Sequence, residues 1–157
     1  MEPQIIEKGP IKLVGLVFYG NPEHGDFGKT WERFGHHMDA IPDRVNKHEA
    51  YGLELYPPEF PDPNAWIYFA AVEVSSFEQV PHYMVMKELP ASKYAVFTVT
   101  GGLGNIGKVF HYAYDEWLPK SGYEMVLPFD LEFYDELFEK SNMQDLYVYI
   151  PIKEKGG

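Results

Sequence analysis

The feature that most restricts the fold of this chain is an internal repeat. The segment YGLELY (51–56) aligns with FDLEFY (129–134) at a shift of 78 residues. Gly20 aligns with Gly101, and WIYFAAVEV with LYVYIPIKE, at shifts of 81 and 80 residues. The three shifts nearly agree, and two copies are too few for a solenoid. The sequence therefore predicts a duplicated half-domain.

Each predicted copy has the same order of elements: strand, helix, strand, strand. The copies span 11–80 and 92–154, and apolar residues at helical spacing place their helices at 26–38 and 105–118. One such half buries too little apolar surface to be stable alone. We therefore expect an α+β fold in a single domain, 1–157, with one antiparallel sheet. Both helices should lie on one face of the sheet, with a ligand-sized groove between them.

Composition and charge exclude several classes of protein. A net charge of −11 argues against direct binding to nucleic acid or to an anionic membrane surface. The absence of cysteine excludes disulfides and thiolate chemistry. His36 and His37 point apart on a helix, and His111 with Asp115 supplies only two ligands, so we expect no metal. With no targeting segment visible, we expect a cytoplasmic protein without cofactors.

Glu132 is the first candidate for a functional side chain. Leu131 and Phe133 flank it, so strand alternation places it on the face opposite both. If that face lines the groove, its carboxylate could bind a cation with help from nearby rings, or act as a general acid or base. The alternative is a solvated acid on an outer face. We expect that alternative for Glu54, its partner in the repeat.

Aromatic side chains could form the walls of such a groove. Tyrosine and tryptophan combine a large apolar body with a polar group, which suits a planar or cationic ligand. The alternative for each is ordinary packing. The candidate ligand-binding aromatics are Trp66, Tyr68, Tyr112, Tyr147 and Tyr149.

Several strings resemble the GyrI-like effector-binding domain family. Its members include the ligand-binding halves of MerR- and AraC-type multidrug-sensing transcription regulators, and gyrase-inhibitory proteins. In that family a glutamate of the penultimate strand, within an E-x-Y pattern, faces cationic or polar ligands in an aromatic pocket. Glu132 in Glu132-Phe133-Tyr134 matches this pattern. The resembling strings are KYAVFTVTGG (93–102), EWLPKSGYE (116–124), LEFYDE (131–136) and YVYIPIKE (147–154).

The resemblance implies a small-molecule binding protein for a hydrophobic ligand, cationic or neutral. Two alternatives stay open at this point. Some stand-alone relatives are hydrolases of reactive cyclopropane-containing compounds, for which Glu132 would be the catalytic residue. Others bind a protein partner, as gyrase inhibitors do. The family's regulators also carry a helix-turn-helix domain, which we do not expect within these 157 residues.

Overall fold

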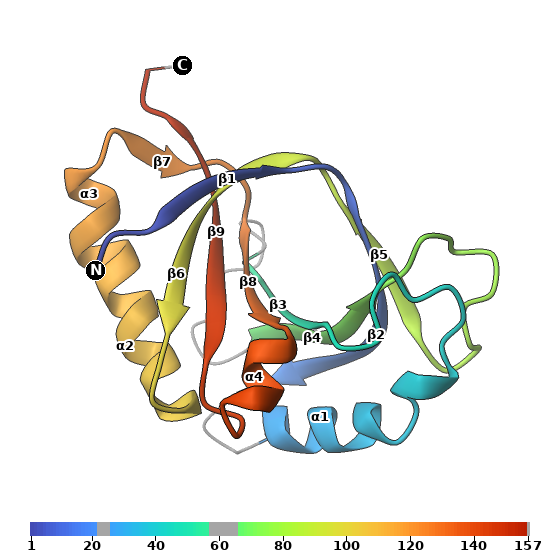
Figure 1. Ribbon diagram of the computed structural model, residues 1–157. Coiled ribbons are helices and arrows are strands. Elements are labelled where there is room, and N and C mark those ends of the chain that lie inside the picture. The colour runs from blue at the N-terminus through green and yellow to red at the C-terminus, as the bar shows by residue number, and fades with distance from the viewer. Residues whose placement is uncertain (22–25, 57–65, 157) are drawn as a thin grey trace.

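The chain folds around one strongly curved antiparallel sheet with helices on its outer face (Figure 1). The computed structural model describes residues 1–21, 26–56 and 66–156. The strands are β1 (Gln4–Lys8), β2 (Ile11–Gly20), β3 (Ala50–Leu55), β4 (Trp66–Glu73), β5 (Val85–Leu89), β6 (Ser92–Val99), β7 (Tyr123–Met125), β8 (Phe129–Tyr134) and β9 (Leu146–Glu154). The helices are α1 (Asp26–Gly35), α2 (Ile106–His111), α3 (Leu118–Lys120) and α4 (Glu136–Lys140). A π-helical segment, Tyr112–Trp117, joins α2 to α3, and 3₁₀ turns lie at Met38–Ala40 and Leu103–Asn105.

The strand order is symmetric about the centre of the sheet. It runs β1-β6-β9-β8-β3-β4-β2-β5, and β7 pairs with β9 off this path. The first half of the chain supplies β3, β4 and β2, and the second half supplies β8, β9 and β6 in the matching order. The predicted α+β fold class is confirmed. Superposition of the two halves as duplicated copies stays a prediction.

One long ribbon connects the two ends of this order. Lys8 of β1 pairs with Ser92 of β6, and Ile11 of β2 pairs with Leu89 of β5 in the same register. The segments β1–β2 and β5–β6 therefore form a single bent antiparallel ribbon. The sheet curls into a ring that encloses a core of aliphatic and aromatic side chains. The largest of these include Tyr51, Leu53, Phe69, Tyr94, Leu131 and Phe133.

The outer face of the sheet carries the helices. Phe34 of α1 is fully buried against Val14 and Val72. The second helical segment packs Val109 against the apolar side chains of β6 and β9, which include Val148. Both helices thus cover the same face, as the sequence predicts. The central pair β3–β8 lies between them.

Several local features differ from the sequence prediction. The first helix ends at Gly35, three residues early. The sequence predicts a loop containing Glu136, Glu139 and Asn142, but a short helix, α4, forms there. The side chain of Asp135 caps this helix by accepting a hydrogen bond from the Leu137 amide. Strands β1 and β7 were not expected, since each is stabilised by a partner distant in sequence.

Candidate functional site: an acidic groove between the helices

A cavity of about 590 Å³ lies over β3 and β8, between α1 and α2. Its size falls in the range of small-molecule sites in proteins. Aromatic and apolar side chains from both helices form its walls, and carboxyl groups from the central strands form its floor. The lining residues are Phe27, Glu54, Tyr56, Trp66, Ile106, Gly107, Phe110, His111, Tyr114, Asp115 and Glu132.

Three carboxyl groups gather on this face of the central strands. Glu132 pairs across the strands with Gly52, and Asp130 pairs with Glu54, so the alternation of both strands puts all three acids on the outer face. Glu132 is 6% exposed and Glu54 is 5% exposed, while Asp130 is fully buried behind them. Buried carboxylates are costly unless they are paired or hydrogen-bonded. Burying three carboxyl groups side by side therefore costs free energy unless hydrogen bonds or a bound cation compensate for the lost hydration.

Two tyrosine hydroxyls hold the Glu132 carboxylate. Tyr68 donates to Glu132 Oε1 at 2.8 Å, and Tyr134 donates to the same oxygen at 2.7 Å. Tyr68 in turn accepts a hydrogen bond from Trp31 Nε1 at 2.9 Å. Gly52 makes this network possible, because a Cβ there would lie 2.2 Å from the Tyr68 hydroxyl. The network fixes the orientation of Glu132 from both sides of the groove floor.

Two further tyrosines form hydrogen bonds with the other two acids, Asp130 and Glu54. Tyr114 donates to Asp130 Oδ2 at 2.6 Å. The Tyr56 hydroxyl lies 2.9 Å from the same Asp130 oxygen and 3.0 Å from Glu54 Oε2. A phenol has one hydrogen to donate, so Tyr56 cannot satisfy both acids at once. Asp130 Oδ1 is buried with no hydrogen-bond partner among the described residues.

Burial shifts the titration of this cluster. Burial raises the pKa of Glu54 well above its ordinary value, and repulsion from Asp130 and Glu132 raises it further. Burial also raises the pKa of Asp130, although hydrogen bonds from Tyr114, Glu54 and Tyr56 oppose that shift. Glu54 and Asp130 therefore both hold a proton more readily than ordinary carboxyl groups do.

The aromatic walls stand close to these acids. Phe27 of α1 stacks on Tyr68 with ring centroids 4.1 Å apart, and it meets Trp66 edge-on at 6.5 Å. Phe110 and Tyr114 stack along the second helix at 6.2 Å. The π-helical segment presents Tyr114 to the groove. Such segments occur often at functional sites.

The structure brings together only part of the predicted site. Glu132 and Trp66 line the groove, and Tyr68 lies just beneath it, bonded to Glu132. Tyr147 and Tyr149 do not lie there. Tyr149 pairs with Leu131 and Tyr147 with Phe133, so both point to the inner face.

On that inner face Tyr149 does meet a cation, but the cation belongs to the chain itself. Lys8 Nζ lies 5.6 Å from the centre of the Tyr149 ring and 5.4 Å from that of Phe133. The expectation that Tyr147 and Tyr149 share a groove with Glu132 is therefore wrong. Tyr112 also lies away from the groove, packed edge-on against Phe97.

Sequence reasoning missed several residues of the site. Glu54, expected to be solvated, is buried in the groove floor. Asp130 was overlooked, although it lies two residues before Glu132 and so shares its face. The repeat held a usable signal, because it aligns Glu54 with Glu132 and Gly52 with Asp130. The same alignment matches Tyr56 with Tyr134, the tyrosine of the E-x-Y pattern, whereas no comparable signal marks Tyr114.

The described segments contain neither a candidate metal site nor a helix that could span a membrane. No group of three or more acidic or histidine side chains there is arranged to hold a metal ion. None of the helices in those segments is long and apolar enough to cross a membrane.

A family model described as the GyrI-like small molecule binding domain matches residues 1–153. The chain belongs to this family. The GyrI-like chain is also 30% identical over 154 residues to the transcriptional regulator BrlR of Pseudomonas aeruginosa. That alignment covers 96% of this chain and 56% of BrlR, so the chain spans little more than half the length of the curated regulator it matches.

Solved structures show that the GyrI-like fold is shared. SAV2435 bound to tetraphenylphosphonium superposes with a TM-score of 0.74 at 18% identity, covering 98% of this chain and 94% of the other. The C-terminal domain of EcmrR superposes with a TM-score of 0.73 at 14% identity, covering 98% of each chain. The family and the small-molecule-binding class predicted from sequence are confirmed. The individual binding residues stay predictions.

Proposed function

We propose that the groove of this GyrI-like domain binds a lipophilic cation. The positive charge lies against Glu132 and Glu54, and the apolar body packs on Phe27, Trp66 and Phe110. The observation that carries this proposal is the pair of almost fully buried acids on the floor of an aromatic cavity. Among the described lining residues there is no lysine or arginine to neutralise them.

Physical chemistry favours a cation over a neutral or anionic ligand. A bound cation compensates the desolvation of the carboxylates, and the surrounding rings add cation–π attraction. A weakly hydrated cation with aromatic groups loses little on leaving water and gains the whole apolar wall. SAV2435, which shares the fold, was solved with such a compound, tetraphenylphosphonium. This supports the ligand class.

Titration calorimetry with tetraphenylphosphonium tests the proposal. Glu132→Gln keeps the shape of the side chain and the acceptor for Tyr68 and Tyr134, but it removes the charge. Truncating one member of a buried charge pair costs about 2 kcal/mol or more, so we expect at least a thirtyfold loss of affinity. Triphenylphosphine oxide, an uncharged relative of the cation, should bind weakly and lose much less.

Glu7→Gln is the matched control. It changes the net charge by the same amount on an exposed strand far from the groove, so tetraphenylphosphonium affinity should stay within about twofold of the wild type. Equal affinities of the wild type and Glu132→Gln for the cation would contradict the proposal. So would turnover of an electrophilic cyclopropane substrate that disappears with Glu132, because that result identifies a hydrolase.

A further inference from the structure

A second cavity, of about 450 Å³, lies between α1, α4 and the loop before β3. It shares no lining residue with the acidic groove. Its interior is apolar and aromatic. The principal side chains there are Trp31, Met38, Leu103, Tyr134, Phe138 and Met143.

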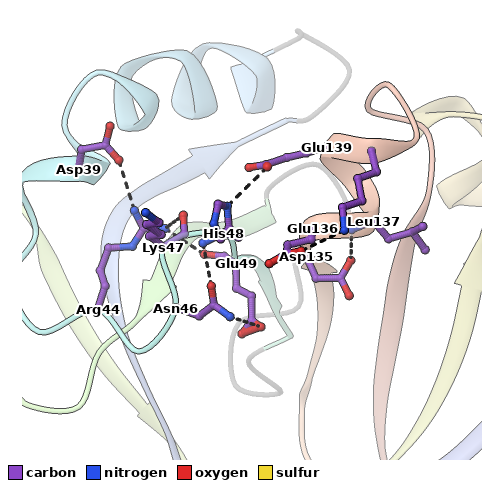
Figure 2. A network of polar contacts seen from close by, with 11 residues as sticks. Asp39, Arg44, Asn46, Lys47, His48, Glu49, Asp135, Glu136, Leu137 and Glu139 are labelled. Atoms are coloured by element: carbon purple, nitrogen blue, oxygen red, sulfur yellow. Dashed lines mark hydrogen bonds and ion pairs between the residues drawn. The ribbon is translucent and has the colours of Figure 1, made fainter.

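The rim of this second cavity is nearly balanced in charge. Arg44 and Lys47 face three carboxyl groups there, His48 also contributes, and several of these side chains are already paired, as Figure 2 shows. Arg44 bonds Asp39 at 3.4 Å and two backbone carbonyls, while His48 lies 3.6 Å from Glu139. The His48–Glu139 pair joins the loop before β3 to α4, across two walls of the cavity. The site therefore offers no strong net attraction for a cation or an anion.

We propose that this second cavity is a separate site for an uncharged aromatic molecule. Such a molecule can fill an apolar interior lined by aromatic and methionine side chains without disturbing the paired charges at the rim. A cation should bind more strongly in the acidic groove, where buried carboxyl groups attract it, than in this second cavity. The two cavities thus select ligands by charge.

The side chains that separate the two cavities should couple ligand binding in one cavity to ligand binding in the other. Tyr134 lines the second cavity, and its hydroxyl donates to Glu132 in the groove. Trp31 also lines it, and its indole donates to Tyr68, the other donor to Glu132. Trp31 and Tyr134 meet edge-on at 5.4 Å. A ligand that holds these two rings in place also holds the two hydroxyl donors on Glu132, keeps its carboxyl group oriented toward the groove, and so strengthens cation binding.

Two helical glycines provide a matched pair of blocking variants. Gly28 lines the second cavity and Gly107 lines the acidic groove, and a Cβ at either would meet nothing within 4 Å. A leucine at either position can therefore enter its cavity without a backbone clash. The probe is N-phenyl-1-naphthylamine, an uncharged aromatic whose fluorescence rises in apolar surroundings. We expect Gly28→Leu to weaken probe binding at least tenfold and Gly107→Leu to leave it within about twofold.

Absence of probe binding to the wild type, or equal binding by Gly28→Leu, overturns the second site. This arm does not depend on the cation proposal. The coupling does rest on it, and is measured by titrating tetraphenylphosphonium with and without saturating probe. We expect the probe to raise cation affinity at least fivefold in the wild type and not in Gly28→Leu. Unchanged affinity in the wild type overturns the coupling, and a decrease shows that both ligands compete for the groove, which overturns the proposal.

Discussion

Glu54 shows how far a single residue can depart from its sequence context. The alternation of AYGLELY alone does not distinguish its glutamate from a solvated strand acid, and sequence reasoning assigned it that role. The structure buries it beside Asp130 and Glu132, because β3 and β8 are neighbours at the centre of the sheet. The pKa of Glu54 depends on two acids some eighty residues away, which local patterning cannot reveal.

The raised pKa of Glu54 gives a stability that falls with rising pH. The folded state holds the proton more tightly than the unfolded state, in which the pKa is about 4.3. Between those two pKa values folding requires proton uptake, so each step upward in pH costs stability. Glu54→Gln removes this cost. It should match the wild type in unfolding free energy below about pH 4 and exceed it by an amount that grows as the pH rises above that value.

Urea unfolding of both proteins at a series of pH values measures this difference. Glu7→Gln, at an exposed site, should follow the wild type throughout. A stability difference for Glu54→Gln that stays constant with pH would show that Glu54 has an ordinary titration in the folded protein.

At the scale of elements, β3 acts as a thin spacer between β4 and β8. Tyr68 of β4 reaches Glu132 of β8 across Gly52, which has no side chain in the way. A Cβ at Gly52 would lie 2.2 Å from the Tyr68 hydroxyl and 2.8 Å from Glu132 Oε1. Gly52→Ala should therefore cost about 1–3 kcal/mol of stability and weaken cation binding.

Gly28→Ala is the reference for that substitution. Its Cβ meets nothing within 4 Å in a helix, so it should stabilise the protein by about 0.5–1 kcal/mol. Thermal unfolding of the two variants compares them directly. Equal stability of Gly52→Ala and the wild type would contradict the prediction, because it would mean that the Tyr68 hydroxyl can move aside for a Cβ at position 52.

The elements themselves were largely predictable, because each strand's alternation is local. The patterns of SKYAVFTVT (92–100) and DLYVYIPIK (145–153) predict strands, and these correspond to β6 (Ser92–Val99) and β9 (Leu146–Glu154). What was not predictable is which face of β9 joins Glu132. That depends on the register between β8 and β9, where Glu132 pairs with Val148 and leaves Tyr147 and Tyr149 on the other side. Register across strands is a long-range property, and the alternation of one strand does not contain it.

At the scale of the whole molecule, the negative net charge disfavours nucleic acid as a binding partner. The net charge of −11 repels the phosphates of nucleic acid, and no counterion release can offset that repulsion. We expect no measurable affinity of this chain for random duplex DNA at physiological salt. Fluorescence anisotropy with a labelled duplex tests this, and a salt-sensitive micromolar transition would contradict it.

The ribbon that joins the two ends of the sheet also makes closure of the ring depend on contacts between distant parts of the chain. Gln4 must meet Val96, and β9 must enter between β6 and β8, before the ring exists. Closing such distant contacts costs chain entropy before any core is sealed. The acidic groove rests on β3 and β8, a pair that also joins the two halves of the chain. The acidic groove therefore needs strands from both halves of the chain, so a chain that ends before β8 lacks the floor of the proposed site.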